Sequence, residues 1–118
     1  TSEMRVGEAC KQYQERTCEL FEAKGHLTIK SDPAIQKGYV HSLGHGLGLH
    51  VHERPWFSAI ATNTDRLDPG AVFTIEPGLY YPDQGMGVRL ENSATVRPDG
   101  QIEVLAEFPL DLVLPMQR

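Results

Sequence analysis

Most of the histidines gather in one glycine-rich segment of the chain. All five lie before residue 53, and four of them fall within twelve positions: His41, His45, His50 and His52. A lone histidine is usually structural, but four in a glycine-rich stretch are not the pattern of a hydrophobic core. Imidazole binds zinc, copper, iron, cobalt or manganese, and glycine lets the backbone fold closely around a ligand. The segment is therefore a candidate metal or substrate site.

Two glutamates further along the chain could join this site. Glu76 ends an apolar stretch, 71–76, and period-2 alternation places its side chain on the same face as Thr74. A buried carboxylate is costly unless something pairs with it. On the expected return strand, Arg89 and Glu91 share a face, so we expect the arginine to accompany an inward-facing carboxylate. The alternative is a solvated ion pair of little energetic weight.

One histidine and two glutamates form a mixed nitrogen and oxygen ligand set. Such a set favours hard or borderline divalent ions over copper(I) or a thiolate zinc site. Bridging carboxylates hold the two ions of two-metal hydrolases roughly 3.5–4 Å apart, where they generate a hydroxide nucleophile near neutral pH. The residues alone thus indicate a metal-dependent hydrolase.

Other site chemistries fit the sequence less well. His50 and His52, followed by a glutamate, resemble the first half of a cupin site, but that site takes a further histidine from a later strand and none follows His52. A serine nucleophile is not expected because the G-x-S-x-G elbow does not occur.

The candidate residues need elements that position them. An amphipathic helix is expected from Ser2 to Lys24, with Ser2 as its cap and Gly25 as the residue that ends it. Strands are expected over 71–76, 88–96 and 102–105, with turns at 82–87 and 98–100. The sequence thus predicts an α+β chain in which a long helix precedes an antiparallel meander.

Composition limits the functions that remain. With 118 residues, 40% of them hydrophobic, one core is expected. A formal net charge of −5 argues against nucleic acid, and no apolar run approaches the roughly 20 residues of a membrane span. Cys10 and Cys18 would lie about 12 Å apart on the expected helix, so we expect free thiols and a cytoplasmic setting. Because the chain starts at Thr1, we expect a piece of a longer protein.

Three segments, in order, carry a family resemblance. They are HSLGHGLGLHVHERP at 41–55, LDPGAVFTIEPG at 67–78 and GVRLEN at 87–92. Together they resemble the C-terminal half of the pita-bread metallopeptidases (peptidase family M24), which include methionine aminopeptidase, aminopeptidase P and prolidase. The resemblance implies a long N-terminal helix packed on a curved, mainly antiparallel sheet.

The resemblance also implies a role for each motif residue. His45, Glu76 and Glu91 would be metal ligands, and Glu76 would also act as general base and proton shuttle. His52 would stabilise the tetrahedral intermediate or contact the scissile carbonyl, and His41 would be a histidine of the substrate pocket.

Arg89, two residues before the last ligand, indicates the proline-specific subclass. The implied activity is hydrolysis of the bond between an N-terminal residue and proline, with two divalent ions, Mn²⁺ or Co²⁺ before Zn²⁺. The implied partner is a peptide with proline at its second position.

One departure from the family pattern matters. Family members bind two metals with five ligands, and the first two are aspartates that precede the helix. Asp32, Asp65 and Asp68 lie in the wrong segments to replace them. We therefore expect residues 1–118 to be the C-terminal portion of a catalytic domain, with weak or no metal binding and no peptidase activity by itself.

The missing half shapes the remaining expectations. The family domain has two pseudo-symmetric halves, so a homodimer could imitate the absent one. The competing interpretation is a non-catalytic pita-bread module used for binding or assembly, because this fold does not guarantee peptidase chemistry.

Overall fold

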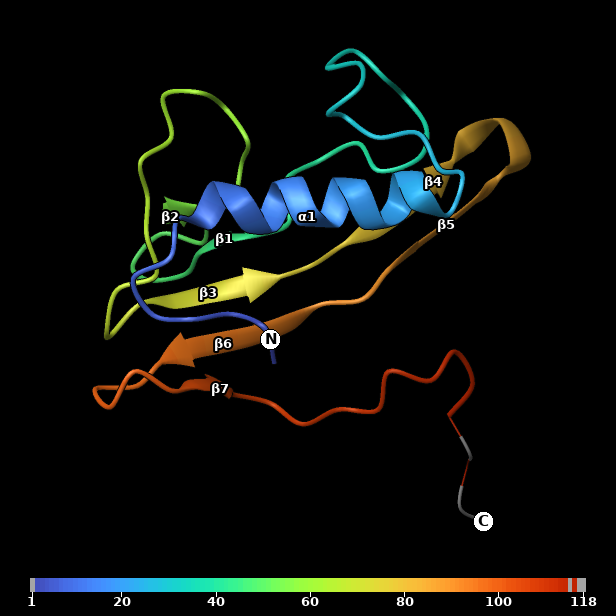
Figure 1. The fold of residues 1–118 in the computed structure, drawn as a ribbon. Coiled ribbons are helices and arrows are strands. Elements are labelled where there is room, and N and C mark those ends of the chain that lie inside the picture. The colour runs from blue at the N-terminus through green and yellow to red at the C-terminus, as the bar shows by residue number, and fades with distance from the viewer. Residues whose placement is uncertain (1, 115, 117–118) are drawn as a thin grey trace.

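A computed structural model describes residues 2–114 and 116. One α-helix, α1 (Cys10–Ala23), lies along one side of a five-stranded sheet, and a two-stranded hairpin extends the sheet at one end (Figure 1). The sheet has the order β2-β1-β3-β6-β7, and all its pairs are antiparallel. Its strands are β1 (His45–Gly46), β2 (Glu53–Trp56), β3 (Val72–Ile75), β6 (Asn92–Val96) and β7 (Ile102–Val104). The hairpin consists of β4 (Gly78–Tyr81) and β5 (Met86–Arg89), joined by a short 3-10 turn at Pro82–Gln84.

The predicted start of the helix is wrong. Helix α1 begins at Cys10, and neither Ser2 nor any other side chain caps it. Gly7 has a φ of +81°, and the backbone around it pairs with 65–67. In that pairing, the N–H of Gly7 donates to the carbonyl oxygen of Leu67 at 2.7 Å. The backbone of 7–10 therefore forms hydrogen bonds with 65–67, and this pairing replaces the helical hydrogen bonds that an earlier helix start would require.

The predicted end of the helix is confirmed. Gly25 has a φ of +86°, a conformation that glycine adopts without steric cost. Its N–H bonds to the carbonyl oxygen of Glu22, and the N–H of His26 bonds to that of Phe21. These two bonds form a Schellman motif, which satisfies carbonyl groups that the helix leaves free.

Of the two longer predicted strands, the first is found as one strand, whereas the second is divided by a bend. The strand predicted at 71–76 is β3, which continues past Pro77 into β4. The strand predicted at 88–96 is divided into β5 and β6, with Leu90 and Glu91 between them. The third, predicted at 102–105, is β7. The breaks at 76–77 and at 90–91 separate the hairpin from the main sheet, and Glu91 lies at the second break.

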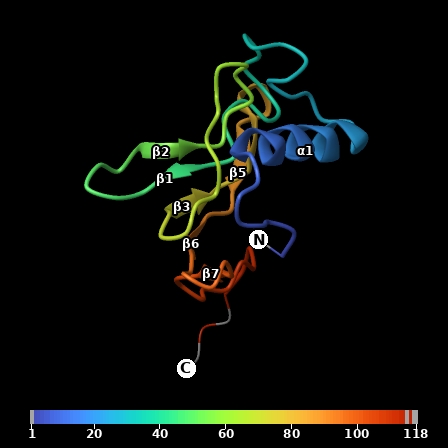
Figure 2. The same cartoon turned by 60° about the vertical axis from the view of Figure 1, so that its left-hand side comes forward.

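The two faces of the sheet differ in chemistry. Phe73 and Ala94 are buried in the core, where the Phe73 and Phe57 ring centroids are 5.2 Å apart and Tyr13 of α1 packs against Phe57. Helix α1 lies on this side of the strands (Figure 2). Cross-strand partners share a face, so the β3–β6 register places Thr74 with Ser93 on the opposite face. That polar face carries the candidate site.

Helix α1 also holds both cysteines. Cys10 and Cys18 are buried and free, as predicted. Burial, followed by the negative charge of Asp65, raises the pKa of the Cys10 thiol to about 12. No helix within 2–114 has the length and apolar character needed to cross a membrane.

Candidate metal centre and substrate site

His45 and Glu76 meet on the polar face of the sheet. His45 lies in β1 and Glu76 directly follows β3, the neighbouring strand. His45 Nε2 is 3.0 Å from Glu76 Oε1, and each residue is only 9% exposed. The N–H of Glu76 also donates to the carbonyl oxygen of Leu43 at 2.8 Å. Backbone pairing thus places these two side chains together.

The chemistry of this contact fits a shared cation. His45 Nδ1 lies 2.9 Å from the carbonyl oxygen of Gly46, so Nδ1 carries the proton and donates it. In neutral imidazole, Nε2 then presents a lone pair to a carboxylate oxygen that also presents lone pairs. The contact needs a proton or a metal ion to reconcile the two acceptors. A backbone carbonyl that orients a histidine in this way is typical of metal ligands.

Thr74 connects the backbone of His45 to the side chain of Glu76. Its hydroxyl donates to Glu76 Oε1 at 2.9 Å, and its Oγ1 accepts the N–H of His45 at 3.1 Å. The predicted common face of Thr74 and Glu76 is thus confirmed. The bridging contact to His45 was not predicted, because it depends on which strand lies beside β3.

Two glycines allow β1 to lie this close to its neighbours. A Cβ atom on Gly44 would lie 2.0 Å from the carbonyl oxygen of Thr74, and one on Gly46 would lie 2.0 Å from that of Arg54. Any side chain at either position would collide with backbone. Glycine in this segment therefore sets the distance between His45 and β3.

A second group of side chains reaches Glu76 from the hairpin. Arg89 Nη1 lies 3.2 Å from Glu76 Oε2, and Arg89 Nε donates to the Tyr80 hydroxyl oxygen at 2.7 Å. The Tyr80 hydroxyl in turn lies 3.2 Å from His41 Nε2. Since His41 Nδ1 faces the carbonyl oxygen of Ser42, its Nε2 accepts the Tyr80 proton. A continuous chain of contacts thus runs from His41 through Tyr80 and Arg89 to Glu76.

The surroundings of Arg89 stabilise its charged form. The hydrogen bond to Tyr80 is the largest cause that raises the pKa of the Arg89 guanidinium above its usual value, and the nearby Glu76 and Glu91 carboxylates add to it, although desolvation opposes them. Tyr80 was not singled out in the sequence. Its signal would have been the β4–β5 register, in which Tyr80 pairs with Gly87 and Gly78 pairs with Arg89. These two pairs are two residues apart along the strands, so Tyr80 and Arg89 lie on the same face of the hairpin.

His52 and Trp56 lie at the rim of the site. The His52 and His45 ring centroids are 4.3 Å apart, and His52 is exposed. Trp56 pairs with His45 across β2 and β1, and its ring centroid lies 6.4 Å from that of His45. The indole is 39% exposed. His50, in contrast, is an exposed residue whose N–H binds Glu53.

Glu91 is not brought to this cluster. It is exposed at the bend between β5 and β6, and Arg89 forms its ion pair with Glu76 and not with Glu91. Among the described residues there is no group of three or more His, Cys, Asp or Glu side chains that could hold a metal ion. The structure thus assembles His45 and Glu76 and leaves the third expected ligand apart.

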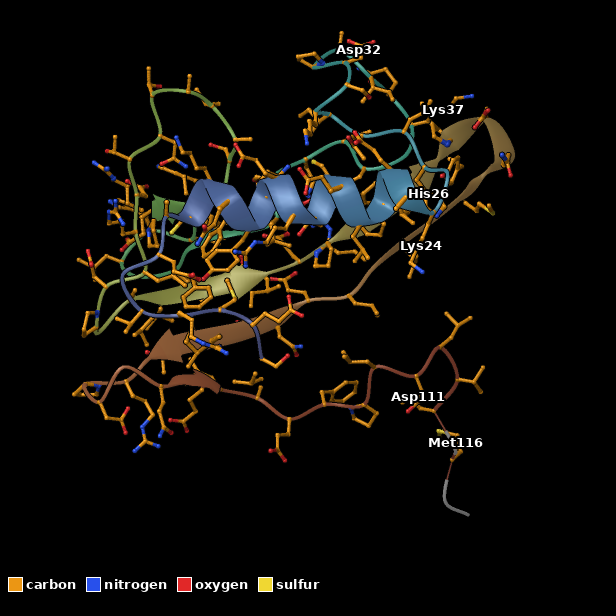
Figure 3. The ribbon with its side chains drawn as sticks, in the orientation of Figure 1. Lys24, His26, Asp32, Lys37, Asp111 and Met116 are labelled. Carbon is orange, nitrogen blue, oxygen red and sulfur yellow. The ribbon has the colours of Figure 1, made fainter. Side chains whose placement is uncertain are left out.

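The other aspartates considered in the sequence lie elsewhere. Asp32 projects from the loop after α1, away from β3 (Figure 3). Asp65 is buried against Arg54 and the N–H of Trp56. Burial raises the pKa of the Asp65 carboxyl, but these hydrogen bonds outweigh it, so the net pKa is lowered.

Comparison with known proteins identifies the family. Residues 1–98 match the model of metallopeptidase family M24, so the chain belongs to that family. A Bacillus subtilis protein with the provisional name dipeptidase YkvY is 46% identical over 95 residues, which cover 76% of this chain and 25% of the relative.

Solved structures show the same relationship. An Xaa-Pro dipeptidase from Bacillus anthracis superposes with a TM-score of 0.74 at 30% identity, over 94% of this chain and 28% of that one. A prolidase from Pyrococcus horikoshii gives 0.73 at 30% identity, over 92% and 26%. The fold is therefore that of the C-terminal half of the pita-bread domain, as predicted. The chain spans about a quarter of the length of these relatives.

Proposed function

We propose that the chain is the C-terminal portion of a two-metal peptidase domain that cleaves the bond between an N-terminal residue and proline. The contact between His45 Nε2 and Glu76 Oε1 carries this proposal, because a buried imidazole nitrogen and a buried carboxylate oxygen 3.0 Å apart are both potential ligands of one cation. The Xaa-Pro dipeptidase and the prolidase among the structural neighbours support the substrate class.

In this proposal, His45, Glu76 and Glu91 are the metal ligands, and two further carboxylates come from the part of the domain that precedes this chain. The mixed nitrogen and oxygen set suits hard and borderline divalent ions; among them we propose Mn²⁺ or Co²⁺, with Zn²⁺ as the alternative. When bound, the ions would activate water and polarise the scissile carbonyl. Glu91 would have to turn inward from its exposed position at the bend.

Each remaining side chain has a task toward the peptide. Glu76 Oε2, which faces Arg89, takes the proton of the attacking water and passes it to the leaving nitrogen. His52, at the rim beside His45, contacts the scissile carbonyl. His41 lines the substrate pocket, and Tyr80 and Arg89 fix its position relative to Glu76.

A non-catalytic module of the same fold is the second candidate. The exposed position of Glu91 favours it, because this residue is the one expected ligand outside the cluster. The two candidates differ in what Glu91 does when metal is present.

Hydrolysis of a Xaa-Pro dipeptide, measured with Mn²⁺, tests the proposal. The intact protein should cleave the dipeptide, and an alanine in place of proline should reduce cleavage. The 118-residue chain alone should be inactive, since it offers at most three of five ligands. An intact protein that binds no metal and cleaves neither peptide would favour the second candidate.

We also propose that the isolated chain pairs with a second copy of itself. The exposed apolar side chains lie mainly on the hairpin and the C-terminal tail, whereas the open face of the sheet is polar. Met86 and Val88 share one face of β5, Leu90 follows at the bend, and all three side chains are exposed. Contiguous apolar patches are uncommon on soluble monomers. Light scattering that shows a clean monomer at high micromolar concentration would contradict this.

A further inference from the structure

Gln14, on the inner side of α1, has its full capacity for hydrogen bonding in use. The residue is 1% exposed. Its Nε2 donates to the carbonyl oxygen of His41 at 3.1 Å and approaches Cys18 Sγ at 3.8 Å. Its Oε1 accepts the N–H of Leu43 at 2.6 Å and the hydroxyl of Tyr39 at 2.7 Å. A buried amide with two donors and two acceptors in use holds its neighbours in one arrangement.

Three of these contacts fall on a single segment, 39–43. It runs from the isolated bridge between Thr28 and Tyr39 to the start of β1 and belongs to no strand itself. The carbonyl of His41 and the N–H of Leu43 therefore need partners from outside the sheet. Gln14 supplies both, in the way that a neighbouring strand would.

The same segment places two side chains of the candidate site. His41 projects from it, and its Nε2 lies 3.2 Å from the Tyr80 hydroxyl. The carbonyl oxygen of Leu43 accepts the N–H of Glu76 at 2.8 Å. A displacement of the segment would therefore move His41 away from Tyr80 and weaken the backbone bond that fixes Glu76.

We propose that Gln14 is a positioning residue of the candidate site. Its amide ties the N-terminal half of α1 to the segment that presents His41 and that anchors Glu76. Gln14 acts through these residues and touches neither substrate nor metal. The inference rests on the proposed function, because His41 and Glu76 have catalytic tasks only there.

Nuclear magnetic resonance of the labelled 118-residue chain tests the proposal without substrate or metal. Gln14→Met keeps the length of the side chain and removes its hydrogen-bonding groups. We expect the Overhauser contact between the His41 and Tyr80 rings to be lost and the Leu43 amide proton to exchange about tenfold faster. Gln14→Glu keeps an oxygen acceptor at the same reach, so it should restore much of the Leu43 protection.

Gln12→Met is the matched control. Gln12 lies on the same helix and, within 2–114, makes no side-chain hydrogen bond to 39–43, so both signals should stay as in the unchanged chain. Unchanged His41 and Leu43 signals in Gln14→Met would overturn the proposal. So would an equal change in Gln12→Met.

A measurement on the unchanged chain covers the case in which Gln14→Met does not fold. The side-chain amide protons of Gln14 should exchange slowly and show an Overhauser contact to His41. Exchange as fast as that of the exposed Gln84 would overturn the proposal. Because peptide cleavage is not the readout, the positioning role and the proposed function can fail separately.

Discussion

The two expected metal-binding glutamates lie in contrasting surroundings. Glu76 follows β3 inside the sheet, where Thr74, His45 and Arg89 all contact its carboxylate. Glu91 lies at the bend between β5 and β6 and is exposed. A carboxylate beside a central strand is placed by the pairing of its neighbours, whereas one at a bend depends on what lies beyond the sheet. The residues of this chain alone thus hold Glu76 in position. We infer that Glu91 needs the rest of the domain to be held in a ligating position.

The largest expected effect comes from Glu76→Gln in the intact protein. Loss of the general base should reduce kcat for an Xaa-Pro peptide by about 10²–10⁴-fold, while the fold is retained. Circular dichroism checks the fold, and initial rates with a saturating peptide check kcat. Turnover near that of the unchanged enzyme would mean that Glu76 is not the general base. The buried position of Glu76 would then give it no catalytic role that Glu91 lacks.

Gly44→Ala should strongly lower the free energy of unfolding, because Gly44 lies against β3 next to Glu76. The new Cβ would lie 2.0 Å from the carbonyl oxygen of Thr74, so β1 or β3 must move. Overpacking of this kind costs about 3 kcal/mol. Gly85→Ala is the control at the hairpin, where a Cβ meets nothing within 4 Å and only the positive φ of 65° is unfavourable. Its expected cost is about 1 kcal/mol. Urea unfolding that gives equal losses would contradict the contrast.

Thr74→Val should have a smaller effect on stability. It keeps the shape of the side chain and removes a hydroxyl that serves both His45 and Glu76, so we expect a loss of about 1–2 kcal/mol. The comparison variant is Thr95→Val, which removes one hydroxyl bond from a partly buried residue to the carbonyl oxygen of Ala71. A Thr95→Val loss as large as that of Thr74→Val would mean that Thr74 has no special place.

Asp65 gives the smallest expected effect, on the pH dependence of stability. Its pKa is lowered in the folded chain, because the bonds from Arg54 and the Trp56 N–H outweigh burial. Its stabilisation is therefore present above the unfolded pKa of about 4 and is lost as the pH falls through the lower, folded pKa. Asp65→Asn should flatten this acid loss in urea unfolding series, whereas Asp99→Asn, at an exposed turn, should leave it unchanged.

The sequence predicts local features of this fold well and distant pairings poorly. The helix end at Gly25 follows from the preference of glycine for positive φ, and the common face of Thr74 and Glu76 follows from strand alternation. The prediction of the helix start was wrong because Gly7 and its neighbours pair with a segment almost sixty residues away. Propensity carries no information about such a partner.

The candidate site shows the same limit. His45 and Glu76 were expected together, and their contact follows from the adjacent positions of β1 and β3. The partner of Arg89 was expected to be Glu91, its neighbour on the strand. The bend at Leu90 and Glu91 interrupts that alternation and leaves Glu76 as the carboxylate within reach. A bend depends on packing between the hairpin and the sheet, which spacing in the sequence does not encode.

We claim that the buried pair of His45 and Glu76 is a partly built metal site. Trp56, the single tryptophan, lies 6.4 Å from His45 between ring centroids and can report on it. We expect Mn²⁺ to quench the fluorescence of the 118-residue chain weakly but saturably, with one ion per chain. His45→Ala and Glu76→Ala should abolish this quenching, and Glu91→Gln should leave it unchanged. Quenching that survives His45→Ala, or two tightly bound ions per chain, would contradict the claim.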